Sequence, residues 1–215
     1  MKGDIVIVDY GMGNLRSVHK ALEKVGCPAV VTQDASLIRD ADGLVLPGVG
    51  AFRKAKENLE QQRLIDPILQ FIQSGKPFLG ICLGLQLLFS ESEEFGQVKG
   101  LEVFRGRVVR FPFSLPGTAM AKDSLKVPHM GWNSVRIEKR CPAMEGIEEG
   151  THFYFVHSYF PVPEDRDIIA TTTDYGGEFV SSVGKGNLFA CQFHPEKSQS
   201  AGLRILQNFG RLVQP

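Results

Sequence analysis

The chain has 215 residues, 43% of them hydrophobic, and its 24 basic and 24 acidic residues leave it without net charge. A chain of this length can bury a substantial core, and balanced charge gives no field that would attract nucleic acid or an anionic membrane. No apolar run approaches the roughly 18 residues that a membrane span requires, and the four cysteines lack zinc-site or disulfide spacing. We therefore expect a cytoplasmic globular protein with no metal, no cofactor and no nucleic-acid or membrane partner.

The first half of the chain alternates predicted strands and helices. Apolar segments bounded by turn residues predict strands at Asp4–Tyr10, Ala29–Thr32, Gly43–Leu46 and Lys76–Ile81. Amphipathic or densely apolar segments predict helices at Asn14–Val25, at Phe52–Gln73 with a break at Pro67, and at Leu83–Phe89. This alternation predicts right-handed crossovers and a mostly parallel central sheet with helices on both faces.

The second half, after Gly100, is rich in strand-like segments separated by turns. They are Leu101–Phe111, Trp132–Ile137, Thr151–Phe160, Ile168–Thr173 and Phe179–Phe193. A loop is predicted at Phe113–Lys126, and a helix at Ala201–Val213 closes the sequence. Because no linker or internal repeat interrupts it, we expect one α/β domain over residues 1–215 with a strand-rich second half.

Cys82 lies between a predicted strand and a predicted helix, in the sequence Gly80-Ile81-Cys82-Leu83-Gly84. Glycines on both sides allow the sharp elbow on which α/β enzymes present a nucleophile, because a Cβ would not fit there. The start of the following helix would favour the thiolate. The alternative is a small, buried, structural cysteine.

A possible base and its orienting carboxylate follow the predicted strand Leu188–Phe193, in the sequence His194-Pro195-Glu196. Pro195 biases His194 toward an extended backbone, in which residues two apart project to the same side. Glu196 could then hold one ring nitrogen of His194 and leave the other for a thiol. Short motifs of this kind are often solvated surface, but together with the elbow cysteine this one favours a Cys-His-Glu triad.

Two glycine-rich turns follow predicted strands. The turn Pro47–Ala51 can present backbone N–H groups beside the elbow, so Val49 and Gly50, together with Leu83, are candidates for an oxyanion hole. The turn Gly11–Asn14 resembles a dinucleotide-binding loop only superficially, because Arg16 stands where the third glycine would be. We interpret it as a tight turn whose polar tip could meet a partner.

The motifs P-G-V-G at 47–50, G-I-C-L-G-L-Q at 80–86 and H-P-E at 194–196 resemble those of class I glutamine amidotransferases, and the similarity spans nearly the whole chain. D-Y-G-M-G-N-L-R-S-V at 9–18, H-M-G-W-N at 129–133 and Y-F-V-H-S-Y at 154–159 further resemble the branch that acts in histidine biosynthesis. The resemblance implies that the cysteine attacks the carboxamide of L-glutamine and that water hydrolyses the γ-glutamyl thioester. The ammonia would pass to a (β/α)8-barrel cyclase subunit of a heterodimer, which makes imidazole glycerol phosphate and an aminoimidazole carboxamide ribotide.

The same resemblance implies roles for individual residues. Cys82 would be the nucleophile, His194 the general base and acid, and Glu196 its orienter. The implied glutamine-binding residues are Gln86, Glu94, His157, Ser158 and Tyr159. The implied interface and channel residues are Asn14, Trp132, Tyr154 and Lys197. Each of these residues also has a purely structural interpretation. Gln86 could pack on its own helix, Glu94 could belong to a solvated acidic run, and Tyr154 could belong to the core.

Three other functions stay open from sequence. A glutaminase could serve a different synthase, although the 9–18 and 129–133 segments speak against it. A cysteine hydrolase of γ-glutamyl compounds could act without a partner, and glutamine hydrolysis by the isolated chain would favour it. A non-catalytic binding subunit is disfavoured because all three triad positions are intact.

Overall fold

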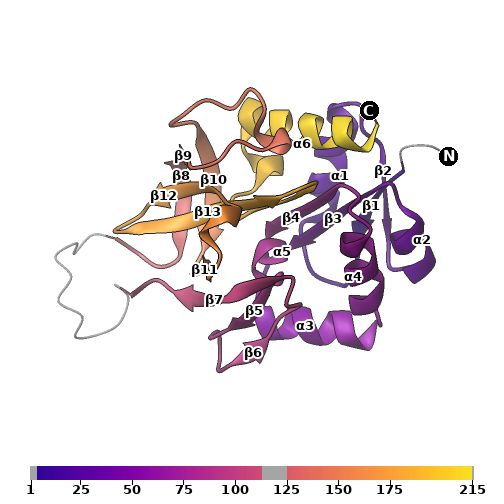
Figure 1. Cartoon of the computed structure of the whole chain (residues 1–215), viewed down its shortest axis with the longest axis horizontal. Helices are drawn as coiled ribbons and strands as arrows, with labels where there is room; N and C mark the ends of the chain where they lie inside the picture. Colours follow the sequence, from indigo (N-terminus) through magenta and orange to yellow (C-terminus); the bar gives the residue numbers. More distant parts are fainter. Residues whose placement is uncertain (1–3, 113–124, 215) are drawn as a thin grey trace.

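A computed structural model describes residues 4–112 and 125–214, and an eight-stranded sheet forms the centre of this part of the chain (Figure 1). Its order is β2-β1-β3-β4-β14-β13-β12-β9, parallel from β2 to β14 and antiparallel from there to β9. The predicted α/β fold with a mostly parallel core is confirmed. The strands are β1 (Ile5–Val8), β2 (Ala29–Thr32), β3 (Gly43–Gly48), β4 (Phe78–Cys82), β9 (Arg136–Ile137), β12 (Ile169–Asp174), β13 (Glu178–Lys185) and β14 (Leu188–Cys191).

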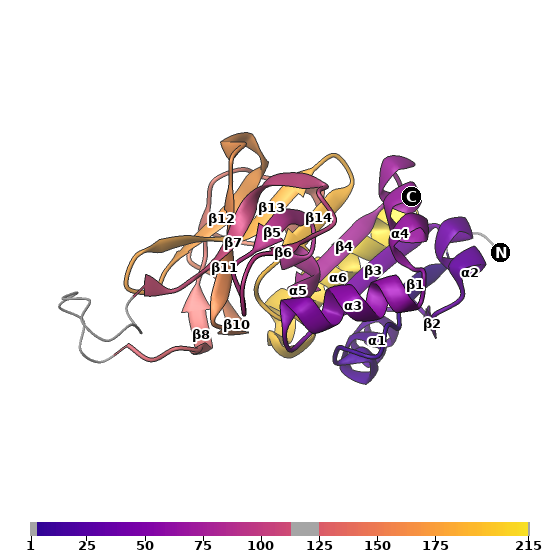
Figure 2. The same cartoon turned by 90° about the horizontal axis from the view of Figure 1, so that it is seen from below.

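Helices cover both faces of this sheet, as predicted (Figure 2). Successive strand residues point to opposite faces, so β1 divides its side chains between two cores. Val6 and Val8 belong to the core that contains residues of α2, α3 and α4, whereas Ile5 and Ile7 belong to the core that contains residues of α1 and α6. The helices are α1 (Leu15–Lys24), α2 (Ala35–Asp40), α3 (Phe52–Gln61), α4 (Ile65–Gln73), α5 (Leu83–Gln86) and α6 (Gln199–Val213).

The strand-rich second half, also confirmed, adds two smaller sheets beside the carboxyl ends of the central strands. One pairs β10 with β8, and the other has the order β11-β7-β5-β6. The chain leaves the first for the second at Ser158. The strands are β5 (Phe89–Ser92), β6 (Val98–Lys99), β7 (Phe104–Arg110), β8 (His129–Ser134), β10 (His152–His157) and β11 (Tyr159–Pro163). Short 3-10 turns are η2 (Pro142–Met144), η3 (Arg166–Ile168) and η4 (Pro195–Lys197).

The predicted helix Leu83–Phe89 was wrong in extent, because α5 ends at Gln86 and Phe89 begins β5. An apolar run this short suits a buried helix and a buried strand equally well. The field of a long helix therefore does not act on Cys82, since α5 is a single turn.

The predicted break at Pro67 was also misplaced. The chain bends between α3 and α4, where Arg63 has a φ of 55°, and Pro67 lies in the first turn of α4. A proline is tolerated there because the first backbone N–H groups of a helix have no intrahelical acceptor. The helix α2 was not predicted, although Asp34 caps it by accepting from the N–H groups of Ser36 and Leu37.

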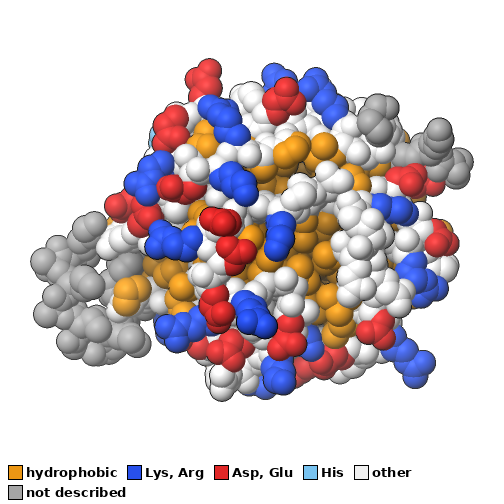
Figure 3. Space-filling view, in the orientation of Figure 1, with side chains coloured by type: hydrophobic (Ala, Val, Ile, Leu, Met, Phe, Trp, Pro, Cys, Tyr) orange, Lys and Arg blue, Asp and Glu red, His pale blue; other side chains and the backbone are white. Residues whose placement is uncertain are grey.

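The predicted loop Phe113–Lys126 lies outside the described residues except for its last two positions. Over the face seen in Figure 3, basic and acidic side chains are interspersed. Among the helices of residues 4–112 and 125–214, none has the length and apolarity needed to cross a bilayer.

Candidate active site

Cys82 stands at the sharp turn between β4 and α5, as predicted, with φ 55° and ψ −105°. A non-glycine residue adopts a positive φ of this kind only where its surroundings impose it. The packing of Gly84 supplies the constraint, because an added Cβ would lie 1.9 Å from the carbonyl oxygen of Leu46. A Cβ at Gly80 would lie 2.9 Å from that of Ala190. The two flanking glycines are therefore required by close packing.

His194 and Glu196 form a buried pair, with 2.9 Å between His194 Nδ1 and Glu196 Oε1 and only 1% of each side chain exposed. His194 itself has the expected extended backbone, with φ −103° and ψ 96°, but the residues after it do not continue the extended segment, because Pro195–Lys197 is a 3-10 turn in which the Lys197 N–H donates to the His194 carbonyl. This turn, and not a continuous extended segment, brings the side chains of His194 and Glu196 together. His194 itself is anchored by its own N–H, which donates to the carbonyl of Tyr154.

The second ring nitrogen of His194, Nε2, is buried and has no hydrogen-bond partner among the described residues. Burial alone would lower the pKa of His194, but the negative charges of Cys82 and Glu196 outweigh it and raise the pKa to about 10. An imidazole with such a pKa readily keeps a proton taken from a thiol. The arrangement therefore suits a thiolate–imidazolium pair oriented by a carboxylate.

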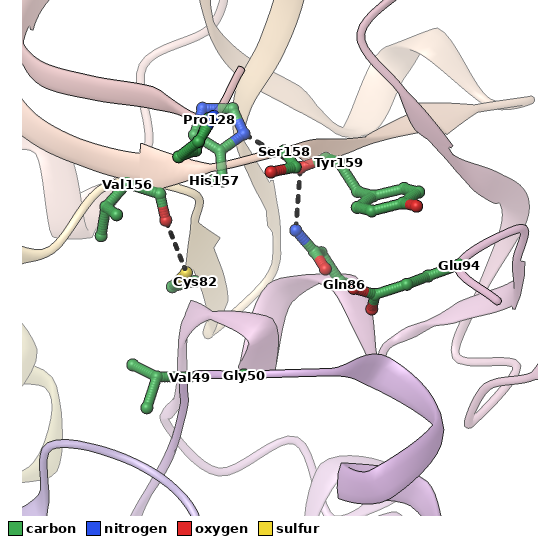
Figure 4. A pocket seen from close by; sticks show the side chains of 10 residues that line it. All are labelled: Val49, Gly50, Cys82, Gln86, Glu94, Pro128, Val156, His157, Ser158 and Tyr159. Carbon is green, nitrogen blue, oxygen red and sulfur yellow. Dashed lines mark hydrogen bonds between the residues drawn. The ribbon is translucent and has the colours of Figure 1, made fainter. Parts of the chain in front are cut away.

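A cavity of about 250 Å³ opens in front of Cys82 (Figure 4). This size suits an amino acid better than a large ligand. All five predicted glutamine-binding residues and two of the three predicted oxyanion residues line it, while Pro128 and Val156 line it without having been predicted. The lining residues are Val49, Gly50, Cys82, Gln86, Glu94, Pro128, Val156, His157, Ser158 and Tyr159.

The turn after β3 lies beside the nucleophile, since Gly48 pairs with Cys82 across β3 and β4. Gly50 has a φ of 98°, which favours glycine, and a Cβ there would lie 2.8 Å from Met12 Cε. The Tyr10 hydroxyl donates to the carbonyl of Pro47 over 2.9 Å and holds the start of the turn. In Figure 4, Val49 and Gly50 lie on one side of Cys82 and Val156 lies on the other.

Two acceptor-bearing side chains lie on the same side of the cavity. Glu94 Oε2 accepts from the N–H of Phe52 at the start of α3, over 2.7 Å. Gln86 is 5% exposed and uses its Nε2 for two hydrogen bonds, to the carbonyl of Tyr159 over 2.9 Å and to Gln192 Oε1 over 3.1 Å. A ligand can therefore reach Gln86 only through Oε1, which is an acceptor.

The His157 ring forms part of the cavity wall. Its Nε2 lies 3.0 Å from His129 Nδ1 and its Nδ1 lies 2.9 Å from the carbonyl of Tyr159, so both nitrogens are engaged. Burial lowers the pKa of His157 to about 3, so the ring is neutral. Because both ring nitrogens are engaged, residues 157–159 would contribute to ligand binding through their backbone.

Three of the four predicted interface residues form one cluster next to the triad. Trp132 and Tyr154 are opposite each other in the β8–β10 pair, with ring centroids 6.3 Å apart. Lys197 Nζ lies 5.7 Å from the centroid of the Tyr154 ring, and Trp132 is 47% exposed. Asn14 stands at the start of α1, which contacts η4.

Sequence reasoning missed Gln192, a fully buried residue whose Nε2 donates to Cys82 Sγ over 3.6 Å. A signal was present, because Gln192 is an amide in the otherwise apolar run Leu188–Phe193 and a buried amide must find partners. The described residues contain no group of three or more His, Cys, Asp or Glu side chains able to hold a metal ion.

Comparison with known proteins agrees with this geometry. The family model described as glutamine amidotransferase class I matches residues 6–212, so the chain belongs to the class I glutamine amidotransferases, and it is a glutaminase. It is 56% identical to imidazole glycerol phosphate synthase subunit HisH of Syntrophotalea carbinolica, over 96% of this chain and 98% of that protein. It is 54% identical to subunit HisH of Geobacter sulfurreducens, over 97% and 98% respectively. Within its class, the chain therefore belongs to the HisH subunits.

Solved structures share the fold at much lower identity. A glutamine amidotransferase from Thermotoga maritima superposes with a TM-score of 0.65 at 17% identity and covers 100% of both chains. The structure of PurLQS from the same organism gives a TM-score of 0.70 at 19% identity, covering 99% of this chain and 98% of that one. These likenesses show the fold alone.

Proposed function

We propose that this glutaminase hydrolyses L-glutamine through a thioester on Cys82 and passes the ammonia to the cyclase subunit of imidazole glycerol phosphate synthase, with which it forms a heterodimer. The observation that carries the proposal is the buried His194–Glu196 pair next to a strained Cys82 at the wall of an amino-acid-sized cavity. Among the described residues, Cys82 carries the only thiol that lines that cavity.

The reaction uses the triad in two stages. Cys82 Sγ attacks the carboxamide carbon while its proton passes to His194 Nε2, and the C–N bond then breaks as His194 returns a proton to the leaving ammonia. His194 next takes a proton from water, which attacks the γ-glutamyl thioester and releases glutamate with the thiolate. Glu196 holds the imidazole by Nδ1 and stabilises its cationic form.

Stabilisation of the intermediate falls to backbone groups. The negative oxygen of the tetrahedral intermediate would be met by N–H groups from the turn at Val49 and Gly50 and from Leu83, the residue after the nucleophile. A preorganised donor of this kind contributes roughly 3 kcal/mol to the transition state.

Recognition of glutamine follows from the charges of the cavity. The substrate ammonium would pair with the Glu94 carboxylate and with Gln86 Oε1, since both are acceptors at the cavity wall. The substrate carboxylate would take N–H groups of the Ser158–Tyr159 segment, where the chain changes sheets. His157 contributes by shaping that segment.

The cyclase would dock on the cluster of Trp132, Tyr154 and Lys197, with Asn14 at its margin. The Tyr154 ring lies against both Trp132 and Lys197, and Lys197 is the last residue of η4, so a partner there would sit next to the site of ammonia release. We place the activity in one domain over residues 1–215, and in the cytoplasm. The four free cysteines support a reducing compartment.

Glutamine-dependent and ammonia-dependent synthesis of imidazole glycerol phosphate by the complex tests the proposal. Cys82→Ala should abolish the glutamine-dependent reaction, leave ammonium salts able to support synthesis, and leave complex formation intact. The control Cys141→Ala, a cysteine outside the cavity, should behave as wild type. Persisting glutamine-dependent synthesis by Cys82→Ala would refute the role of Cys82, and failure of ammonium to support synthesis would refute ammonia transfer.

A further inference from the structure

A chain of buried hydrogen bonds reaches Cys82 from the backbone carbonyl of Tyr159. That carbonyl can only accept, and it lies 2.9 Å from the amide nitrogen of Gln86. The orientation of the Gln86 amide is therefore fixed by the backbone: its NH2 group, and not its oxygen, must face Tyr159.

The orientation of the Gln86 amide determines that of the Gln192 amide. The second N–H of Gln86 is directed at Gln192, 3.1 Å away, so Gln192 must present Oε1 to it. Gln192 Nε2 is then left to face Cys82 Sγ at 3.6 Å. The amide of Gln192 is 0% exposed, so no water competes for either end. Its backbone N–H is held by the carbonyl of Ser181 at 2.8 Å.

A second series of hydrogen bonds also ends on the Tyr159 carbonyl. Asn133 Nδ2 donates to the carbonyl of Asp174 over 2.8 Å, so it also faces His129 Nε2 as a donor, at 3.3 Å. His129 Nδ1–H must then donate to His157 Nε2, and His157 Nδ1–H to Tyr159.

The imidazoles of His129 and His157 in this second series of hydrogen bonds both have to be neutral. Burial lowers the pKa of His129 to about 4 and that of His157 to about 3, which meets the requirement. The Tyr159 carbonyl is thus held from two sides by donors whose direction cannot reverse.

We propose that Gln192 is a hydrogen-bond donor to the nucleophile that stabilises the thiolate of Cys82, and that Gln86 is the positioning residue that fixes the direction of the Gln192 amide. The inference rests on the proposed role of Cys82 as nucleophile. While sulfur carries its proton, the S–H can donate to the carbonyl of Val156 at 3.9 Å. Once the proton has moved to His194, sulfur is an acceptor alone, and Gln192 is the side-chain amide that donates a hydrogen bond to it.

The titratable groups around Cys82 come from several elements, and each stays in place in the test. His194 and Glu196 lie at η4, Cys191 ends β14, Tyr10 follows β1 and His157 ends β10. Changing Gln192 to an isosteric neutral side chain therefore removes the donor without altering the charge of the site.

The test is the pH dependence of Cys82 alkylation by iodoacetamide, followed by mass spectrometry of the peptide that contains Cys82. Gln192→Met should move the midpoint of the pH profile up by about one unit, and so slow alkylation about tenfold at pH values below the wild-type midpoint, while the plateau at high pH stays near that of wild type. Gln192→Glu, which keeps the acceptor for Gln86 but brings an anion to sulfur, should move the midpoint further. The exposed control Gln70→Met on α4 should match wild type.

A midpoint unchanged in Gln192→Met would overturn the proposal, as would an altered plateau with the midpoint in place, because that result describes lost packing. If Gln192→Met does not fold, Gln86→Met decides the matter. It leaves Gln192 present but free to turn, and it should raise the midpoint by a smaller amount; an unchanged midpoint would overturn the inference. The readout needs neither glutamine nor cyclase, so its failure is distinct from a failure of the proposed function, which glutamine hydrolysis by the wild-type complex tests separately.

Discussion

Truncation of Trp132 tests where the cyclase docks. Trp132 is 47% exposed, and its ring is held against Tyr154 across the β8–β10 pair. A large aromatic side chain has an area of roughly 250 Å², so about 120 Å² of it is available to a partner. At about 25 cal/mol per Å², complete burial of that area would contribute about 3 kcal/mol to association.

Trp132→Ala should therefore weaken binding of the cyclase about 100-fold. Isothermal titration of the variant with the cyclase measures this directly, and the rate of Cys82 alkylation by a glutamine analogue checks that the triad is unaffected. Leu37→Ala is the matched control, because Leu37 is 48% exposed but lies on α2, at the other end of the molecule in Figure 1. Equal affinities of Trp132→Ala and wild type would refute the placement of the interface, and so would an equal loss for Leu37→Ala.

Further predictions concern the triad, the elbow and the buried histidines. Glu196→Gln removes the charge that supports protonated His194, so the pKa of His194 should fall and glutamine hydrolysis by the complex should slow about 10- to 100-fold; an unchanged rate would argue against the pair. Gly84→Ala should lower the free energy of unfolding by roughly 3 kcal/mol or more in urea, because the added Cβ meets a backbone carbonyl at 1.9 Å, whereas Gly177→Ala, with open space around it, should change little. Burial lowers the pKa of His129 to about 4 from its ordinary value of 6.5. At pH values between these two, the unfolded chain binds a proton at His129 that the folded chain does not bind. Stability should fall by about 1.4 kcal/mol per pH unit from about 6.5 to about 4 on account of this group. His129→Gln should remove that part of the slope, and an equal slope in both proteins would contradict it.

Much of the fold followed from sequence because the central strands are short apolar runs between turn residues, as at Gly43–Leu46. Local ambiguity explains the errors. The run after Cys82 is mostly apolar, and only the pairing of Phe89 with Phe104 of β7 decides that Phe89 belongs to a strand. The helix α2 has six residues, too few for a clear periodic pattern.

Some features of the candidate active site could be predicted from local sequence and others could not. The elbow at Cys82 was predictable because Gly80 and Gly84 mark a local packing constraint. The neutrality of His157 and the orientation of the Gln192 amide were not, since the first follows from burial in the folded chain and the second from a partner that is far away in sequence. Buried polar residues in apolar runs are the signal that points to such partners without identifying them.

Hydrolysis of glutamine by this mechanism requires a covalent intermediate on Cys82. Acid quenching of the complex during turnover of isotopically labelled glutamine, followed by peptide mass spectrometry, measures it most directly. We predict a γ-glutamyl adduct on the peptide that contains Cys82 in the wild type and no adduct in Cys82→Ala. Glutamate release by the wild type with no adduct on Cys82, or with the label on another residue, would contradict the account.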